Sequence, residues 1–572
     1  MLRHRRHPRI ATSKSVNQRP DSLGDDVERR GTSPYRAKGQ ARLTPLIILV
    51  LAVLAAAARP ARGAAQEISI HSAPRNEIFY LIFVRSFRDS NGDSIGDLKG
   101  IEQELGYLQD LGVTTIVLTP LYQSPFYHSY FADDFSKVDP AYGNEADFRH
   151  MVQALHKRGM KIFIDEEIQY VTSNHEWFRA ATKDPKSPLA RFVYRDGPDN
   201  THMEIMDLAS YDGSKTPVAM VNLHNPAVLD YQAKLFRYWM NPSDNAGADD
   251  GVDGFRIDHM MDDLDNLKKL DNLFTGFWAP LFKSLRAEKP GLRILAEQAD
   301  WNSYGDDWFD RGTVDMVYSF QIRQSIASFD KKRLTGAVSQ TAMRTPPGKQ
   351  QLIFIENHDT DRFATVVDGD IRREKIGASL NLLLKGIPLI YYGQEVGLAG
   401  RQRHDGPTDG NDIPVREAFP WTSEIGPGMA VWYKGPESWW TNSSILKGGY
   451  PSLEKEATDT NSLYAYYKKL VALRNEQSEF VTGEQSIIDN DSPEVFSFER
   501  SEGEHRKLVL VNLADRPTTV HIQARDVVAS PKGIGLRDVF TGDEVSPGSN
   551  NVLEVSLGGY GVGIFSVISS EK

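Results

Sequence analysis

The sequence contains no cysteine among its 572 residues. Disulfide bonds, thiolate catalysis and cysteine-ligated zinc are therefore excluded. Positive charge is also in short supply, because 77 acidic residues outweigh 66 Lys and Arg and leave a formal net charge of -11. This balance argues against nucleic acid or an anionic membrane as a partner. No nucleic acid is expected among the partners, and no obligate protein partner is inferred.

The chain also lacks a long hydrophobic run. Its main apolar segment spans Leu46–Ala58, which is shorter than the roughly 20 residues of a transmembrane helix. An arginine-rich stretch precedes this segment, and small residues follow it up to Gln66. Because this order is typical of an export signal, residues 1–66 are predicted to be a basic lead plus a signal peptide of a secreted or periplasmic protein. The alternative is an uncleaved membrane anchor.

From Glu77 onwards, near-continuous apolar segments alternate with amphipathic helical ones. This alternation is typical of parallel strands that helices cover on both faces. Eight segments are predicted as such strands: 78–84, 114–118, 161–165, 251–257, 293–296, 314–317, 352–355 and 388–391. The pattern predicts an α/β protein with a (β/α)8 TIM barrel over residues 67–483. An open doubly wound sheet is the alternative.

Two segments break this alternation. Residues from about 166 to 225 are rich in Asp, Pro and Gly and are predicted to form an inserted domain after the third strand. Residues 484–572 contain short strand-like segments between turns, which predicts a C-terminal all-β sandwich.

Four of the predicted strands end in polar side chains, namely Asp165, Arg256, Asp258, Glu297, His358 and Asp359. In a TIM barrel the carboxyl ends of the strands meet at one rim. Cleavage of a glycosidic bond needs one protonated and one ionised carboxyl. Crowded acids differ in pKa, and an arginine keeps its partner ionised. The alternative for any single acid is a helix cap, but four strand ends together favour a catalytic site.

The motifs Gly254-Phe-Arg-Ile-Asp258, Leu295-Ala-Glu297 and Glu356-Asn-His-Asp359 resemble those of the α-amylase family, glycoside hydrolase family 13. The resemblance implies a retaining, two-step mechanism. Asp258 would be the nucleophile, Glu297 the acid/base and Asp359 the residue that stabilises the transition state, while Arg256 and His358 would accompany them. The family fold, a barrel with an inserted domain and a C-terminal sandwich, agrees with the expected organisation.

The segment Tyr127-His-Ser-Tyr130 resembles the family motif that stacks on the sugar at the cleavage site. His128, Tyr130 and the following Phe131 are therefore expected to contact substrate. Exo-acting α-glucosidases of the family have an Asp at the position of Phe131, whereas amylases commonly have an aromatic residue. The aromatic residue favours internal cleavage of a longer α-glucan or maltooligosaccharide.

The chain departs from the family pattern where it would hold the sugar. After the third strand it has Gln169 and Tyr170 instead of the usual Asn-His, and Tyr170 is hypothesised to replace the His as a substrate contact. A shifted Asn174-His175 pair is the alternative. After the nucleophile the usual Lys-His is Met261-Asp262.

The loop after the first strand carries oxygen ligands at alternate positions. Asp89, Asn91, Asp93 and Asp97, with the carbonyl of Ile95, could surround one hard cation, most simply a structural Ca²⁺. The loop resembles the metal loop of the oligo-glucosidase and neopullulanase branches of the family. The alternative is a solvated acidic turn.

The sequence thus predicts a secreted, α-amylase-like hydrolase of α-glucans. A transglycosylase or a sucrose/trehalose-type isomerase of the same family is the first alternative, because the residues around the leaving sugar are altered. A non-catalytic, membrane-anchored amylase-like protein is the second. The presence of all three catalytic acids argues against the latter.

Overall fold

The computed structural model of the protein describes residues 76–196, 201–245, 247–404, 409–433, 443–527 and 534–569. The predicted signal segment, residues 1–66, lies outside these ranges. None of the helices within them combines the length and the apolar character that a bilayer crossing requires.

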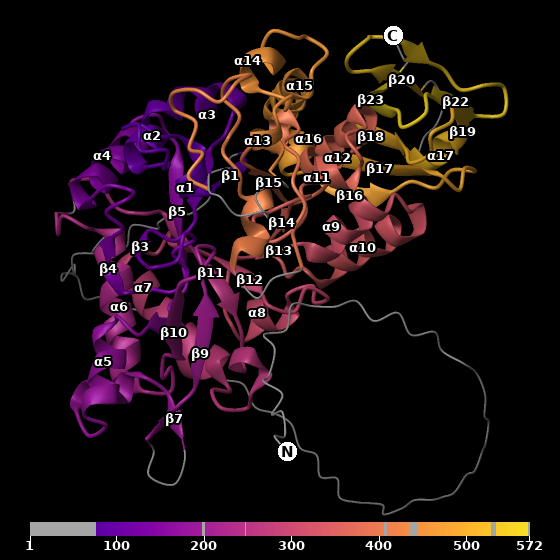
Figure 1. Ribbon diagram of the computed structural model, residues 1–572. Helices are drawn as coiled ribbons and strands as arrows, with labels where there is room; N and C mark the ends of the chain where they lie inside the picture. Colours follow the sequence, from indigo (N-terminus) through magenta and orange to yellow (C-terminus); the bar gives the residue numbers. More distant parts are fainter. Residues whose placement is uncertain are drawn as a thin grey trace, which may run out of the picture. The chain divides into compact units, whose positions relative to one another are not determined.

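Eight parallel strands form a closed barrel (Figure 1). Around the barrel they are β1 (Phe79–Ile82), β2 (Thr115–Leu118), β5 (Lys161–Glu166), β11 (Gly254–Met260), β12 (Arg293–Gln298), β13 (Met316–Tyr318), β14 (Gln350–Ile353) and β15 (Ile387–Tyr391). β1 pairs with both β2 and β15, which closes the ring. The predicted TIM barrel is confirmed, and the alternative of an open sheet is wrong.

The barrel strands read as continuous apolar runs because both of their faces are buried, one inside the barrel and one under the helices. Every side chain of β1, β2 and β15 is buried. Gly254, the first residue of β11, is packed too closely against its neighbours to carry a side chain. A Cβ atom there would lie 2.3 Å from the Phe163 ring and 2.6 Å from the carbonyl oxygen of Arg293.

Several of the larger helices begin at residues whose side chains cap free N–H groups. Asn144 and Asp147 form a reciprocal capping box at the start of α4, and Asn225 caps α6 ahead of Pro226. The longer helices are α2 (Leu98–Gln103), α3 (Leu105–Leu111), α4 (Glu145–His156), α6 (Pro226–Met240), α7 (Ala279–Glu288), α9 (Phe320–Ser328), α10 (Lys331–Arg344), α12 (Ile371–Leu383) and α15 (Leu463–Glu476). Short helices are α1 (Val84–Phe87), α8 (Asp306–Asp310), α11 (Phe363–Val366), α13 (Ser444–Lys447), α14 (Leu453–Glu456), α16 (Ser478–Val481) and α17 (Ala524–Val527).

The insertion after β5 has its own small sheets. β6 (Tyr170–Thr172), β10 (Lys215–Met220) and β9 (Ile205–Ala209) pair in that order, and β7 (Arg195–Asp196) pairs with β8 (His202–Met203). α5 (Glu176–Lys183) follows β6, and α6 leads the chain back to β11. A further hairpin, β3 (Tyr122–Gln123) with β4 (Asp134–Val138), follows β2. The insertion therefore begins directly after the strand that carries Asp165.

The C-terminal region is all-β apart from α17, as predicted. Its larger sheet contains β16 (Glu484–Ile487), β17 (Val495–Glu502), β18 (His505–Asn512), β23 (Val562–Ser569), β20 (Ile534–Asp538) and β21 (Glu544–Val545) in that order. The smaller sheet pairs β19 (Thr518–Gln523) with β22 (Val552–Leu557). Leu508 and Leu510 of the first sheet share a core with Val520 and Ile522 of the second. The sequence analysis missed β16, β20 and β21, and β16 shows why, because no residue of that strand is fully buried.

Two buried arginines, one from this region and one from α15, bond the chain segment at the end of α12. Arg500 of β17 donates from Nη1 to the carbonyl oxygen of Leu383 at 2.9 Å. Arg474 of α15 donates from Nη1 to the carbonyl oxygen of Leu382 at 2.7 Å and from Nη2 to that of Gly386 at 2.9 Å. These contacts satisfy carbonyl groups at the end of α12 that have no partner within the helix.

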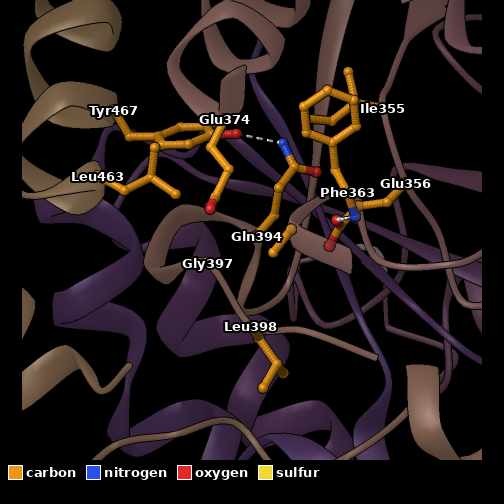
Figure 2. A pocket seen from close by; sticks show the side chains of 10 residues that line it. Ile355, Glu356, Phe363, Glu374, Gln394, Gly397, Leu398, Leu463 and Tyr467 are labelled. Atoms are coloured by element: carbon orange, nitrogen blue, oxygen red, sulfur yellow. Dashed lines mark hydrogen bonds between the residues drawn. The ribbon is translucent and has the colours of Figure 1, made fainter. Parts of the chain in front are cut away.

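A small cavity of about 10 Å³ lies behind the chain segment that follows β14. Gln394 donates to the Tyr467 hydroxyl at 2.7 Å on one side of it, and Glu374 points into the same space (Figure 2). None of the ion pairs among the described residues includes Glu374. Burial, with Glu356 and Glu456 nearby, raises the pKa of Glu374 to about 7.

Candidate active site

Arg256 is fully buried near the carboxyl end of β11 and bonds acids from three neighbouring strands. Its Nη1 donates to Asp258 Oδ1 at 2.7 Å and to Asp165 Oδ2. Its Nη2 donates to Glu297 Oε2 at 2.8 Å. We call these three acids, with Arg256 and Asp359, the acid cluster. The structure brings the predicted strand-end residues together at one rim.

Asp258 and Glu297 share Arg256 but differ in their pKa values. Burial raises the pKa of a carboxyl, but at Asp258 the bonds from Arg256 outweigh burial and hold the pKa below its usual range. At Glu297 burial outweighs Arg256, and with Asp258 and Asp359 it raises the pKa well above the usual range. The pKa values of these two carboxyls are therefore pushed apart, and Glu297 keeps a proton to higher pH than Asp258 does.

Asp359 follows β14 and is held on both oxygens. Arg416 Nη2 donates to Asp359 Oδ1 at 2.9 Å, and His358 Nε2 lies 3.0 Å from Asp359 Oδ2. Arg416 also donates to the Tyr127 hydroxyl at 2.8 Å and to the carbonyl oxygen of His358 at 2.9 Å. The sequence analysis missed Arg416, because it lies on a long excursion after β15 and no strand end marks it.

The predicted aromatic contacts also line the rim. The Tyr130 hydroxyl donates to Asp165 Oδ2 at 2.8 Å and lies 2.7 Å from His358 Nε2. His128 is buried beside it, and its Nδ1 accepts the Tyr130 N–H at 3.1 Å. Burial, together with Arg416 and His358, holds the pKa of His128 well below its usual range. His128 is therefore a neutral imidazole at neutral pH.

Asp165, Asp258 and His358 have ligand atoms within 4.8 Å of one another, as a metal site would require. The guanidinium of Arg256 donates to both acids, and Tyr130 meets the imidazole. Because a fixed cation already neutralises these carboxylates, the three residues belong to the acid cluster and are not assigned to a metal.

The α-amylase catalytic-domain family model matches residues 81–483. The chain belongs to the α-amylase family, glycoside hydrolase family 13. Alpha-amylase 3 of Dictyoglomus thermophilum is 28% identical over 458 residues, which cover 77% of this chain and 85% of the relative. Trehalose synthase/amylase TreS of Mycolicibacterium smegmatis is 26% identical over 491 residues, which cover 74% and 80%. The crystal structure of the alpha-amylase from H. orenii has a TM-score of 0.71 at 27% identity and covers 86% of this chain and 99% of that chain.

Where this chain departs from the α-amylase family pattern, a different set of contacts is present. The Tyr170 hydroxyl donates to Asp265 Oδ2 at 2.7 Å, and His259 Nε2 lies 3.1 Å from Asp265 Oδ1. We call Tyr170, Asp265 and His259 the polar wall. Phe131 meets the Tyr170 ring edge to face at 5.8 Å. Tyr170 and Phe131 thus lie in contact, and their role in binding substrate stays a prediction.

The polar wall pairs an imidazole with a carboxylate beside the acid cluster. Burial lowers the pKa of His259, but the hydrogen bond and charge of Asp265 outweigh it and raise the pKa. The backbone N–H of His259 points to Glu297 Oε2 at 3.4 Å. The residue has a φ of +45°, in the left-handed region. His259 and Asp265 could not be predicted from the sequence, because both reach the polar wall through backbone of positive φ that no periodic pattern marks.

Two other residues at which the chain departs from the family pattern, His175 and Asp262, are bonded to groups outside the acid cluster. His175 caps α5, where its Nδ1 accepts the Trp177 N–H at 3.2 Å, and burial lowers its pKa to about 4. The hypothesis that Asn174-His175 is a shifted sugar contact is therefore wrong. Both oxygens of Asp262 are occupied, one by Arg311 Nη2 at 2.6 Å and one by the Phe274 N–H at 2.8 Å.

In the loop from Asp89 to Asp97, backbone N–H groups donate to the loop's own Asp side chains. Asp89 is buried and accepts the N–H groups of Asn91, Gly92 and Ser94 at 2.7–3.0 Å. Asp93 Oδ1 accepts the Ile95 N–H at 2.8 Å. Asp97 Oδ1 caps α2 at the Gly100 N–H, at 2.7 Å. The side chains that could bind a metal are therefore held in place by the loop's own backbone.

Proposed function

We propose that the protein is a secreted, retaining hydrolase of α-glucans. The observation that carries this proposal is the pair Asp258 and Glu297, which lie on neighbouring strand ends and bond one buried arginine at 2.7 and 2.8 Å, with the pKa lowered at Asp258 and raised at Glu297. Retaining glycosidases need this pair. The aromatic residues Tyr130 and Phe131 at the rim support a sugar substrate. The apolar faces of sugar rings stack on aromatic side chains.

In the proposed mechanism, Glu297 gives its proton to the glycosidic oxygen while the Asp258 carboxylate attacks the anomeric carbon. Arg256 keeps Asp258 ionised and oriented for this attack. The sugar is then bound to Asp258 as an ester, and Glu297 is ionised. Glu297 takes a proton from a water molecule, whose oxygen attacks the anomeric carbon and releases Asp258. Asp359, fixed by Arg416, holds sugar hydroxyls.

Product sizing on maltooligosaccharides and soluble starch tests this proposal. Hydrolysis predicts shorter products only, with the α-configuration retained in the first product observed by NMR. Asp258→Asn should abolish the reaction, whereas Asp262→Asn, a matched control in the same segment but outside the acid cluster, should leave the same products. Activity that survives in Asp258→Asn would contradict the proposal.

A transglycosylase is the second candidate, and the polar wall favours it. Tyr170 stands where the family usually has a His that contacts the sugar, and Asp265 is bonded both to it and to His259. The usual Lys-His at the leaving sugar is Met261-Asp262. The relative named trehalose synthase/amylase joins both activities in its name. Longer oligosaccharides or isomerised disaccharides in the same assay, at increasing acceptor concentration, would assign the chain to this class.

We also propose export through the segment Leu46–Ala58, whose order of basic, apolar and small residues supports it. Expression of the full chain followed by N-terminal sequencing tests this. Mature protein outside the cytoplasm that starts near Gln66 is expected. Full-length protein retained in the membrane fraction would instead assign an anchor.

A structural calcium ion at Asp89, Asn91, Asp93, Ile95 and Asp97 is proposed as well. The donor set fits, because carboxylate, amide and carbonyl oxygens are the ligands of hard cations and the backbone holds Asp89 and Asp93 in place. At a calcium concentration about 100-fold above Kd, binding adds about 2.7 kcal/mol to the free energy of unfolding. We expect EDTA to lower Tm and calcium to restore it, with both effects lost in Asp93→Ala. A Tm that ignores calcium would contradict the site.

A further inference from the structure

Glu167, directly after β5, is a buried carboxyl outside the predicted acid trio. Its side chain is 2% exposed. Gln169 donates to it from the backbone N–H at 2.6 Å and from Nε2 at 3.1 and 3.3 Å. The same Nε2 lies 3.2 Å from the carbonyl oxygens of Asp258 and His259. Glu167 is therefore tied to the chain segment that carries the proposed nucleophile.

The surroundings of Glu167 decide which of two adjacent acids holds a proton. Glu166 of β5 pairs with Ile257 of β11, so Glu167 and Asp258 follow at neighbouring positions of the two strands. Asp258 raises the pKa of Glu167, and Glu167 raises that of Tyr170. Asp258 has Arg256 at 2.7 Å, whereas Glu167 has no partner of positive charge among the ion pairs of the described residues. Two neighbouring buried carboxyls cannot both be ionised at low cost. The acid without the arginine is the one that keeps its proton.

Other charged groups lie around Glu167 and Asp258, and they leave the proton on Glu167. Beyond Asp258 are Arg256, Glu297 and His259, all of which act on Asp258. Glu166, the preceding residue, accepts the Tyr122 hydroxyl, and successive strand side chains point to opposite faces. Burial and Asp258 both raise the pKa of Glu167 well above its usual range. The charges and the contacts around the pair therefore both favour a neutral Glu167.

We propose that Glu167 is a positioning residue, a neutral carboxyl that donates its hydrogen to the Asp258 carboxylate and fixes it for attack. The proposal rests on the proposed function, in which Asp258 is the nucleophile. A hydrogen bond to a carboxylate is stronger than one to an ester. The contact therefore stabilises the free Asp258 anion and favours its release in the second step.

The pH dependence of kcat/KM on a maltooligosaccharide tests this role, because its acid limb reports the ionisation of Asp258 in the free enzyme. Glu167→Gln retains a donor, so the acid limb should stay within about 0.3 pH unit of wild type. Glu167→Leu removes the donor that stabilises the anion, so the limb should move up by roughly one unit. Glu166→Gln is the matched control and should leave the limb in place.

A shift of the acid limb to lower pH in Glu167→Gln would overturn the proposal. If Glu167 were ionised, its charge would raise the pKa of Asp258, and Glu167→Gln would move the acid limb to lower pH. Infrared difference spectra give a readout that needs no activity. Wild type minus Glu167→Gln at neutral pH should show one neutral carboxyl C=O band, whereas a carboxylate band in its place would refute the proton assignment.

These results separate the two proposals. Persistent activity in Asp258→Asn would remove the proposed function, whatever the spectra show. An inactive Asp258→Asn together with a lowered acid limb in Glu167→Gln would remove only the role of Glu167. If Glu167→Leu does not fold, as judged by circular dichroism, the Gln variant and the spectra still decide.

Discussion

The acid cluster and the polar wall meet at β11 but are held in different ways. The cluster is built on strand ends around Arg256, which is fully buried and bonds three acids. In the polar wall, Asp265 lies in the loop after β11 and His259 at the end of that strand, and both have a positive φ. Strand ends fix the positions of the acid cluster, whereas loop conformation sets the polar wall beside it. The loop can therefore change without moving the acids.

The largest loss of activity is expected from substitutions in the acid cluster. Glu297→Gln removes the proton donor, so kcat on maltooligosaccharides should fall on the order of 10³-fold or more. A glucoside with a good leaving group needs little protonation, so its first step should be much less affected. Comparing kcat on the two substrates measures this difference. Equal losses on both would mean that Glu297 acts by something other than proton transfer.

A smaller effect is expected in the polar wall. Asp265→Asn removes an ionised acceptor shared by Tyr170 and His259, so kcat/KM should fall about 10-fold, the equivalent of about 1.4 kcal/mol. The pKa of His259 should also fall, because Asp265 stabilises the cation; NMR titration of the imidazole measures it. Tyr170→Phe removes one of the two bonds and should cost less. A loss as large as that of Glu297→Gln would break the distinction between the two regions.

The smallest effect on activity is expected at Glu374, a buried acid without an arginine. Its pKa of about 7 lies above the usual value of 4.5, so the folded state binds the proton more tightly and loses stability as pH rises from about 4.5 through 7. Glu374→Gln removes this titration. The variant should be more stable than wild type by roughly 1–3 kcal/mol at about pH 8 and equal to it at about pH 4.

Chemical denaturation at the two pH values, with kcat as the control, measures this. A variant that is no more stable than wild type at the higher pH would show that Glu374 is ionised at little cost. Such a result would weaken the argument that Arg256 is what keeps Asp258 charged.

Much of the fold and the acid cluster could be predicted from the sequence. The barrel strands are buried on two faces and read as apolar runs, so Asp258 and Glu297 could be placed at their ends. β16 could not be predicted, because its side chains are at most half-buried and leave no apolar pattern.

The remaining site residues depend on loop paths that no periodic pattern records. Arg416 reaches Asp359 from a segment after β15, and Asp265 reaches Tyr170 only because its backbone takes a φ of +56°. Glu167 is different, since its position after β5 was visible. Its importance depends on the absence of a positive partner, which is a three-dimensional property.

The arginine that joins the C-terminal sheets to the barrel has a thermodynamic consequence. Arg500 of β17 bonds the carbonyl oxygen of Leu383 and is buried, and Arg474 of α15 bonds the neighbouring carbonyl oxygen of Leu382. A chain truncated before β16 would lose Arg500 and leave the Leu383 carbonyl without this donor. Local loss of the sheets therefore carries a penalty inside the barrel, which couples the melting of the two parts. The C-terminal region acts as a structural closure of the catalytic domain and not as a detachable appendage.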